Sequence, residues 1–189
     1  MRRLSNWLHS ASKGWVALLG LVVFLLFTAL VLPAQSSRAE AQSESAGSPD
    51  TSFWYSPDDL YRMAEAYGRQ GRQAYIQARF TFDIAWPLVY TFFLVTNISW
   101  LFSRVYAPDS RWQIANLTPL LAMLLDLLEN ISTSLVMVRY PQPSPFIAWL
   151  APLFTASKWA FVSLSFLLLI LGLAQALWNL IRKREKTPA

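Results

Sequence analysis

The chain has 189 residues, of which 54% are hydrophobic and 14% are charged, and its net charge is +5. Soluble domains usually carry about 25% charged residues, so this composition is typical of a protein embedded in lipid. The lack of Cys and the presence of a single His, His9, exclude disulfides, thiol chemistry and a zinc site built from His and Cys. The sequence therefore predicts no metal and no cofactor. Its basic residues are not interleaved with aromatic residues as in a nucleic-acid-binding surface, so no nucleic-acid partner is expected.

The N-terminal part, residues 1–32, is predicted to form a basic cytoplasmic segment followed by transmembrane helix 1. An uncharged run extends from Val16 to Leu32, and it is longer than the roughly 7–15 apolar residues of a signal-peptide core. An Ala-x-Ala pattern that resembles a cleavage site stands at 39–41. Helix 1 is expected to be an uncleaved anchor, with a cleaved signal over residues 1–41 as the open alternative.

Residues 33–52 are rich in Ser, Ala and Gln and show no apolar periodicity, so they are predicted to be a disordered linker. The next segment, residues 53–79, is predicted to lie outside as an amphipathic element at the membrane interface. Ser56, Pro57 and Asp59 stand in the order of a capping box with Pro in the first turn, which predicts the start of a short helix.

Residues 80–181 are predicted to form a three-helix membrane core, because they contain long and nearly uncharged runs. A single helix over the last of these runs would be about 54 Å long, well beyond the roughly 30 Å of the hydrocarbon core, so that run is divided. The expected elements are helix 2 over 84–103, helix 3 over 114–138, an interfacial or re-entrant piece over 146–155, and helix 4 over 159–181.

These elements make the chain an all-α, polytopic membrane protein with four transmembrane helices, or three if residues 1–41 are cleaved. Lys and Arg residues flank the spans at the N-terminus, in the turn over 103–111 and in the basic tail over 182–189. In a four-helix topology these three segments share one side of the membrane, and the positive-inside rule makes that side cytoplasmic. The prediction is a multi-pass protein of the cell membrane with both termini in the cytoplasm.

Polar residues recur at helical spacing inside the predicted spans. Residues that are seven, four or three positions apart lie on one face of a helix, and polar faces avoid lipid. The faces are therefore expected to turn toward one another, with helix 1 packed outside them. They comprise Asp83, Tyr90 and Asn97 on helix 2, Asp126, Glu129, Asn130 and Thr133 on helix 3, and Lys158, Ser165, Gly172 and Asn179 on helix 4.

The acids and Lys158 are expected to gather in the outer half of the bundle, and two interpretations of them remain open. In the first, Lys158 neutralises Asp83 or Glu129 as a structural ion pair, and Arg79 competes for Asp83. In the second, the same groups form a pocket for a cation, an amine or a lipid head group. The candidate ligand-binding residues are Asp83, Tyr90, Asp126, Glu129, Asn130 and Lys158.

Two further functions also remain open. Asp126 and Glu129 have the spacing of an acid–base pair, which would suit an enzyme acting on a lipid inside the membrane, but no nucleophile or phosphate loop stands beside them. The polar helices could instead belong to a proton or cation pathway, built as a homo-oligomer or with partner membrane helices. The leading hypothesis is a non-enzymatic bundle in the lipid bilayer that binds a small ligand, a lipid or a partner helix.

The pattern resembles the EXPERA membrane fold of sigma-2 receptor and emopamil-binding proteins over residues 80–180. The resemblance rests on Asp83 with Pro87 in helix 2, and on Pro119 followed by Glu129 and Asn130 in helix 3. It implies four helices and a long first outer loop. The isomerases of that family use a membrane-embedded His with a Glu, and this sequence has no such His, so the resemblance does not extend to sterol isomerisation.

Overall fold

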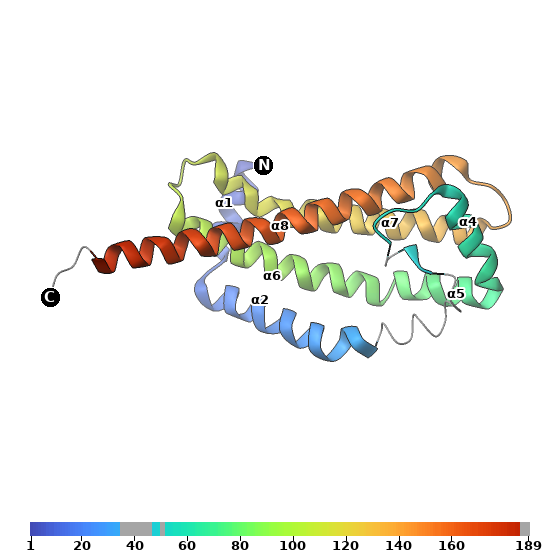
Figure 1. The fold of residues 1–189 in the computed structure, drawn as a ribbon, viewed down its shortest axis with the longest axis horizontal. Helices are drawn as coiled ribbons and strands as arrows, with labels where there is room; N and C mark the ends of the chain where they lie inside the picture. Colours follow the sequence, from blue (N-terminus) through green and yellow to red (C-terminus); the bar gives the residue numbers. More distant parts are fainter. Residues whose placement is uncertain (35–46, 50–51, 186–189) are drawn as a thin grey trace.

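The computed structural model of the chain describes residues 1–34, 47–49 and 52–185, and the regular structure in that part is helical (Figure 1). The prediction of an all-α polytopic membrane protein with four transmembrane helices is confirmed. The cleavage-like site at 39–41 and most of the predicted linker over 33–52 lie outside the described residues. The segments that are long and apolar enough to cross a membrane are Gly14–Ala34, Gly68–Val105, Arg111–Arg139 and Pro145–Lys183.

The four spans run alternately in opposite directions along the long axis of the molecule, so the two ends differ in character (Figure 1). The N-terminus, the loop at 106–110 and the C-terminal part of the last helix lie toward one end, called here the termini end. The connector at 140–144 and two short helices, α4 (Pro57–Ala66) and α5 (Gly68–Arg79), lie at the other end, called the capped end.

The centre of the bundle consists of α6 (Phe82–Val105), α7 (Thr118–Arg139) and α8 (Pro145–Glu185), with a 3₁₀ segment, η3 (Arg111–Leu117), leading into α7. The most extensive contact joins α7 to α8. A small residue lets α8 approach α6, because a Cβ on Gly172 would lie 3.0 Å from the ring of Phe102. Phe102 and Leu94 of α6 are fully buried in the middle of this core.

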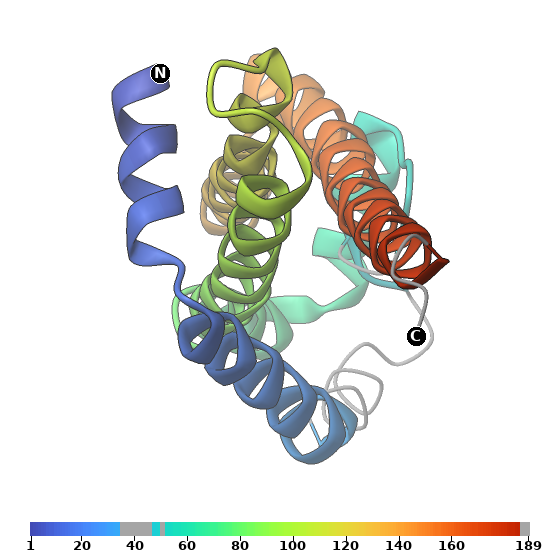
Figure 2. The ribbon, with the colours of Figure 1, turned by 90° about the vertical axis from the view of Figure 1, so that its left-hand side faces the viewer.

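The N-terminal segment forms two helices, α1 (Arg2–Ala11) and α2 (Gly14–Leu26), of which only the second was predicted. α2 continues into a π-helical turn, η1 (Phe27–Val31). α1 packs against α6 and η3, while α2 packs mainly along α6, on the outside of the bundle (Figure 2). The approach is close because a Cβ on Gly20 would lie 2.7 Å from the Thr96 hydroxyl.

The capped end begins at the predicted capping box. The Ser56 hydroxyl accepts a hydrogen bond from the Asp59 N–H at 3.1 Å, and the Asp59 carboxylate accepts one from the Ser56 N–H at 2.8 Å. Gly68 has a φ of +58°, a left-handed conformation that lets the chain turn between α4 and α5. α4 lies across the ends of α7 and α8, where its Leu60 and Ala64 are fully buried.

The predicted division of the last apolar stretch is wrong, because α8 is one continuous helix of 41 residues. At 1.5 Å per residue its length is about 60 Å, more than a membrane needs. Its first turns pack against α4, and its last turns extend past the other helices (Figure 1). Pro152 lies inside α8 without ending it, and the neighbouring Ala148 and Ala151 are fully buried in the capped-end core. A length beyond the membrane thickness thus did not divide this helix.

Candidate functional site

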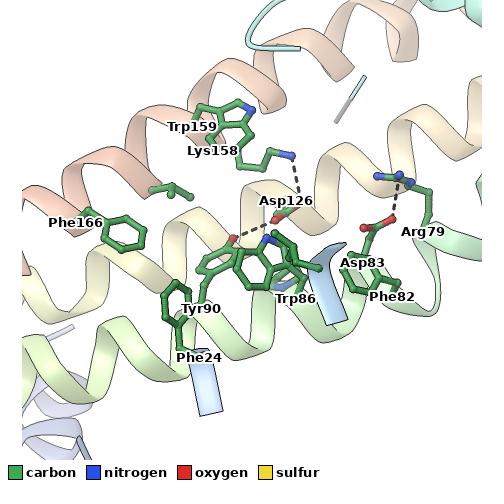
Figure 3. Close-up of a pocket in the computed structure, with 13 residues that line it drawn as sticks. Phe24, Arg79, Phe82, Asp83, Trp86, Tyr90, Asp126, Lys158, Trp159 and Phe166 are labelled. Carbon is green, nitrogen blue, oxygen red and sulfur yellow. Dashed lines mark hydrogen bonds and ion pairs between the residues drawn. The ribbon is translucent and has the colours of Figure 1, made fainter. Parts of the chain in front are cut away.

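A cavity of about 280 Å³ lies among α2, α6, α7 and α8, toward the capped end (Figure 3). Its walls are mainly apolar with many aromatic rings, and charged side chains reach it from several helices. Apolar walls with a few convergent polar groups are typical of a small-molecule site. The aromatic lining residues are Phe24, Phe82, Trp86, Tyr90, Trp159 and Phe166, and the charged ones are Arg79, Asp83, Asp126 and Lys158.

Three buried side chains, called here the Lys158 triad, join α7 to α8 beside the cavity. Lys158 Nζ lies 3.4 Å from Asp126 Oδ1 and makes a shorter ion pair with Glu129 Oε2. Asp126 and Glu129 are almost one helical turn apart, so both carboxyl groups can face the same neighbouring helix. Glu129 is fully buried, and Asp126 and Lys158 are only 7% and 6% exposed. The charges of the triad are therefore largely removed from solvent.

Tyr90 connects α6 to the triad, because its hydroxyl donates to Asp126 Oδ2 at 3.1 Å (Figure 3). Trp86, one turn earlier, meets the Tyr90 ring edge-on with 5.8 Å between centroids. Asp126 thus contacts Tyr90 through one carboxyl oxygen and Lys158 through the other, and it also lines the cavity. Glu129 does not line the cavity, so the two acids of the triad have different surroundings.

A second ion pair links α5 to the start of α6. Arg79 Nη2 lies 3.0 Å from Asp83 Oδ2, and the guanidinium lies over the Tyr75 ring at 4.5 Å. Asn130 Nδ2 donates to the backbone carbonyl of Asp83 at 3.0 Å, which fastens α7 to the same end of α6. Of the two expected partners of Lys158, the structure pairs Glu129 with it and places Asp83 against Arg79. The local spacing of four residues makes the latter pair easy to form.

The capped end covers the triad through Tyr55, which precedes α4. Thr155 Oγ1, almost one turn before Lys158, donates to the Tyr55 hydroxyl at 3.1 Å. Burial raises the pKa of Tyr55 well above its ordinary value, because the phenolate would lose its hydration, so this hydroxyl stays neutral. Helical spacing from Lys158 could have identified Thr155, whereas no sequence signal identified Tyr55.

Asn97 and Asn179, two residues of the predicted polar faces, make hydrogen bonds that involve neither the cavity nor the Lys158 triad. Asn97 donates to the Ala17 carbonyl at 3.0 Å, and so joins α6 to α2 rather than to the triad. Asn179 accepts a hydrogen bond from Gln175 on an exposed part of α8. The reason is geometric: seven residues fall about 20° short of two full turns, so a stripe with a period of seven drifts around a straight helix.

A second polar network, called here the termini-end network, lies where α1, α6 and η3 meet, and the sequence pattern did not predict it. Asn116 Nδ2 donates to the Ser99 hydroxyl at 3.0 Å and to the Ser5 carbonyl at 3.2 Å. Ser5 donates to the Gln113 carbonyl at 2.9 Å. The ring nitrogens of His9 lie 2.9 and 3.0 Å from the carbonyl oxygens of Ser99 and Gln113. These contacts fasten α1 to the bundle.

The site offers carboxyl groups, one ammonium, one guanidinium, a phenol and several aromatic faces. Within the part of the chain that the structure describes, no group of three His, Cys, Asp or Glu side chains lies close enough together to hold a metal ion. The groups on the cavity wall can make hydrogen bonds, ion pairs and aromatic contacts. No protein-family model, no curated protein and no solved structure matches the chain.

Proposed function

We propose that this membrane protein binds a small, lipid-soluble ligand with a cationic or amine head in the cavity beside the Lys158 triad. The observation that carries the proposal is the combination of aromatic walls with the Asp126 carboxyl group on the same cavity. A carboxylate in an enclosed site pairs with a positive or hydrogen-bond-donating head, and the rings receive the apolar body.

The aromatic side chains support a ligand with both an apolar and a cationic part. The Phe24 ring of α2 stacks on Trp86 with 5.8 Å between centroids, which builds a continuous aromatic wall between α2 and α6. Aromatic faces also attract cations that lie within about 6 Å of the ring centroid. The cavity volume of about 280 Å³ is at the small end of ligand sites. It suits an alkyl or aryl amine, or the head of a lipid, rather than a whole phospholipid.

The position of the cavity supports access from the bilayer. Phe24 and Leu32 line it from the side of α2, and Trp159 and Phe166 line it from α8. α2 packs mainly on α6 and makes few contacts with α8. A lipid-soluble ligand would therefore pass between α2 and α8, where few protein contacts have to be broken.

The binding proposal is tested with dodecyltrimethylammonium, a quaternary cation with an alkyl chain, and with dodecanol as its uncharged counterpart. Protein in lipid nanodiscs would be titrated with each probe while Trp fluorescence is recorded, because Trp86 and Trp159 line the cavity. The cation should change the fluorescence saturably. Asp126→Asn should weaken its binding about tenfold, which corresponds to about 1.4 kcal/mol.

Matched variants separate the cavity from the bulk membrane. Asp58→Asn removes an exposed carboxyl on α4 and should bind the cation as the wild type does. Trp149→Phe removes a Trp that is 58% exposed and should keep the signal, whereas Trp86→Phe should reduce it. Non-saturable signals of equal size from both probes in every variant would contradict the proposal and leave the cluster with a structural role.

The orientation is the second part of the proposal, with both termini in the cytoplasm and the capped end outside. It is supported by the basic residues of the three segments at the termini end, through the positive-inside rule. Reporter fusions at Ser45 and Arg184 should report opposite sides of the cell membrane, and an outside signal from the fusion at Arg184 would contradict the orientation. In the sequence, the basic residues of these segments are Arg2, Arg3, Lys13, Arg104, Arg111, Arg182, Lys183, Arg184 and Lys186.

The alternative of a lipid-modifying enzyme has less support in the geometry. Asp126 lines the cavity, but Glu129 lies against Lys158 outside its lining, so the two carboxyl groups do not face a common substrate. Lipid analysis of a deletion strain would separate the two functions. An accumulated precursor with a missing product would favour the enzyme, and unchanged lipids would favour binding.

A further inference from the structure

The Lys158 triad contains more acid than base. Asp126 and Glu129 both contact the single ammonium of Lys158, the first at 3.4 Å and the second more closely. If both carboxyl groups were ionised, the triad would carry a net negative charge although its side chains are almost fully buried. An unbalanced buried charge costs several kcal/mol even after relaxation, so charge balance favours one retained proton.

The neighbouring groups do not restore the balance. Arg79 of α5 is the other buried cation of the described core, and it pairs with Asp83 of α6 at 3.0 Å. The other titratable groups that surround the triad are phenols, which are neutral at ordinary pH: Tyr55 before α4, Tyr75 on α5 and Tyr90 on α6. Adding the Arg79–Asp83 pair to the triad leaves its excess of one carboxyl group unchanged.

We propose that Asp126 and Glu129 share one proton when the cavity is empty, and that a cationic ligand replaces this proton when it binds. The second half rests on the proposed function. In the exchange the positive charge of the ligand enters beside Asp126, and one proton leaves the triad for water. The net charge of the site stays the same, only a carboxyl O–H bond is broken, and nothing is oxidised or reduced.

The contacts of the two carboxyl groups suit this exchange. Asp126 lies on the cavity wall, where a ligand can reach it, and Tyr90 donates to one of its oxygens. Glu129 lies outside the cavity lining and keeps the closer contact with Lys158. Because the two acids are coupled through one ammonium, the proton belongs to the pair rather than to either residue.

Infrared spectroscopy tests the shared proton without any ligand. A protonated carboxyl group has a C=O stretching band that is separated from the bands of carboxylates, and an ester-free detergent keeps that region clear of lipid signals. Wild-type protein at neutral pH should show the band. Asp126→Asn and Glu129→Gln should each abolish it, because either variant leaves one carboxylate for one ammonium. Lys158→Met should strengthen it, and Asp58→Asn, on the exposed surface of α4, should leave it unchanged.

Two results would overturn the shared proton. A wild-type spectrum without the band would show that both acids are ionised. A band that disappears in only one of the two acid variants would assign the proton to a single residue. A missing wild-type band is decisive even if a variant fails to fold. A band that is present is assigned to the triad by the two acid variants, whose replacements are close in shape to the native side chains.

The exchange itself is tested with dodecyltrimethylammonium in a weakly buffered solution that contains a pH indicator. One proton should be released for each cation bound, so the affinity should rise up to tenfold for each unit of pH. A carboxylic acid band without any binding would overturn the proposed function and the exchange but not the shared proton. Binding without proton release would overturn the exchange and leave the binding function in place.

Discussion

The two polar networks of this protein hold helices together with different chemistry. At the termini end, Asn116 and Gln113 donate amide N–H groups to backbone carbonyls and to a hydroxyl, and Gln113 caps the end of α6 by reaching the carbonyls of Phe102, Tyr106 and Ala107. Toward the capped end, Lys158 and Arg79 meet carboxyl groups beside a cavity.

The comparison distinguishes polar side chains that only hold helices together from charged side chains that can also bind a ligand. The amides and hydroxyls of the termini-end network need no counter-charge, and their N–H and O–H donors find acceptors, although the side-chain carbonyl oxygens of Gln113 and Asn116 are buried without a hydrogen-bond partner among the described residues. Full charges in a buried site need balance, and beside a cavity that balance can be changed by a proton or by a ligand. We therefore expect variants of the termini-end network to affect stability alone, and variants of the Lys158 triad to affect stability and binding together.

The largest loss of stability is expected from Lys158→Met, which leaves Asp126 and Glu129 buried without their ammonium. Removing one partner of a buried ion pair costs about 3–5 kcal/mol in soluble proteins, and polar contacts in membranes measure about 1–2 kcal/mol. We expect a decrease in the free energy of unfolding of about 2–3 kcal/mol, between these ranges. Thermal unfolding in detergent would measure it.

The partner of Lys158 can be identified with double variants. Adding Glu129→Gln to Lys158→Met should recover part of the lost stability, because one buried carboxyl group disappears with its cation. Adding Asp83→Asn should recover nothing, because Asp83 is paired with Arg79. Equal recovery in both double variants would mean that the two ion pairs act as one network.

A smaller loss is expected from Asn116→Leu in the termini-end network. The change removes hydrogen bonds to Ser5 and Ser99 from a fully buried position, and we expect a cost of about 1–2 kcal/mol. Binding of dodecyltrimethylammonium should stay unchanged. Asn179→Leu, on α8 outside both networks, is the control and should alter neither property. Weaker binding in Asn116→Leu would show that the two networks are coupled.

Ser56→Ala should lower the free energy of unfolding by about 1 kcal/mol, because it removes the N-cap of α4. α4 belongs to the capped end, which covers the Lys158 triad. Hydrogen bonds from the Ser56 hydroxyl and N–H lower the pKa of Asp59 below its ordinary value of 3.8. Because the pKa of Asp59 is lower in the folded state, its ionised carboxylate stabilises the fold at pH values above 3.8. This stabilisation is lost as the pH falls through the lowered pKa of the folded state. Thermal unfolding across this pH range should show the difference between the two proteins becoming smaller at the acid end without vanishing, because the Ser56 hydroxyl still accepts a hydrogen bond from the Asp59 N–H. A difference that does not change with pH would contradict a contribution from the contact between the Ser56 hydroxyl and the Asp59 carboxylate.

The smallest loss is expected from Asn97→Leu, which removes a single hydrogen bond between α6 and the peripheral helix α2. Such contacts in membranes average about 0.6 kcal/mol. The same unfolding measurement would detect the change. A decrease in the free energy of unfolding as large as that of Lys158→Met would show that α2 belongs to the core of the bundle. It would also contradict the expected difference between contacts inside and outside the Lys158 triad.

Local patterns predicted what depends on neighbours in the chain. The capping box at Ser56 follows from side chains and backbone groups within a few residues. Helical spacing also placed Asp126 and Glu129 on one face and toward Lys158. It failed for Asn97, where the drift of a seven-residue repeat turns the side chain toward α2. The length limit of a single span failed for α8, which is one continuous helix across Pro152.

Tertiary contacts decided the parts of the site that come from distant segments. Tyr55 reaches Thr155 across 100 residues of sequence, and Tyr90 reaches Asp126 across 36, so no local pattern could have joined them. Local patterns also could not predict the contacts of His9 and Ser5, because these residues lie in α1, a helix without an apolar run in its sequence.

The sequence by itself determined that this chain has helices long and apolar enough to cross a membrane and that acids and a lysine stand on their polar faces, because hydropathy and helical periodicity are properties of contiguous residues. Only the tertiary structure decided which acid meets which cation and where a cavity remains. The physical reason is that these outcomes depend on how four helices are rotated and spaced against one another, which side-chain packing across the whole bundle sets.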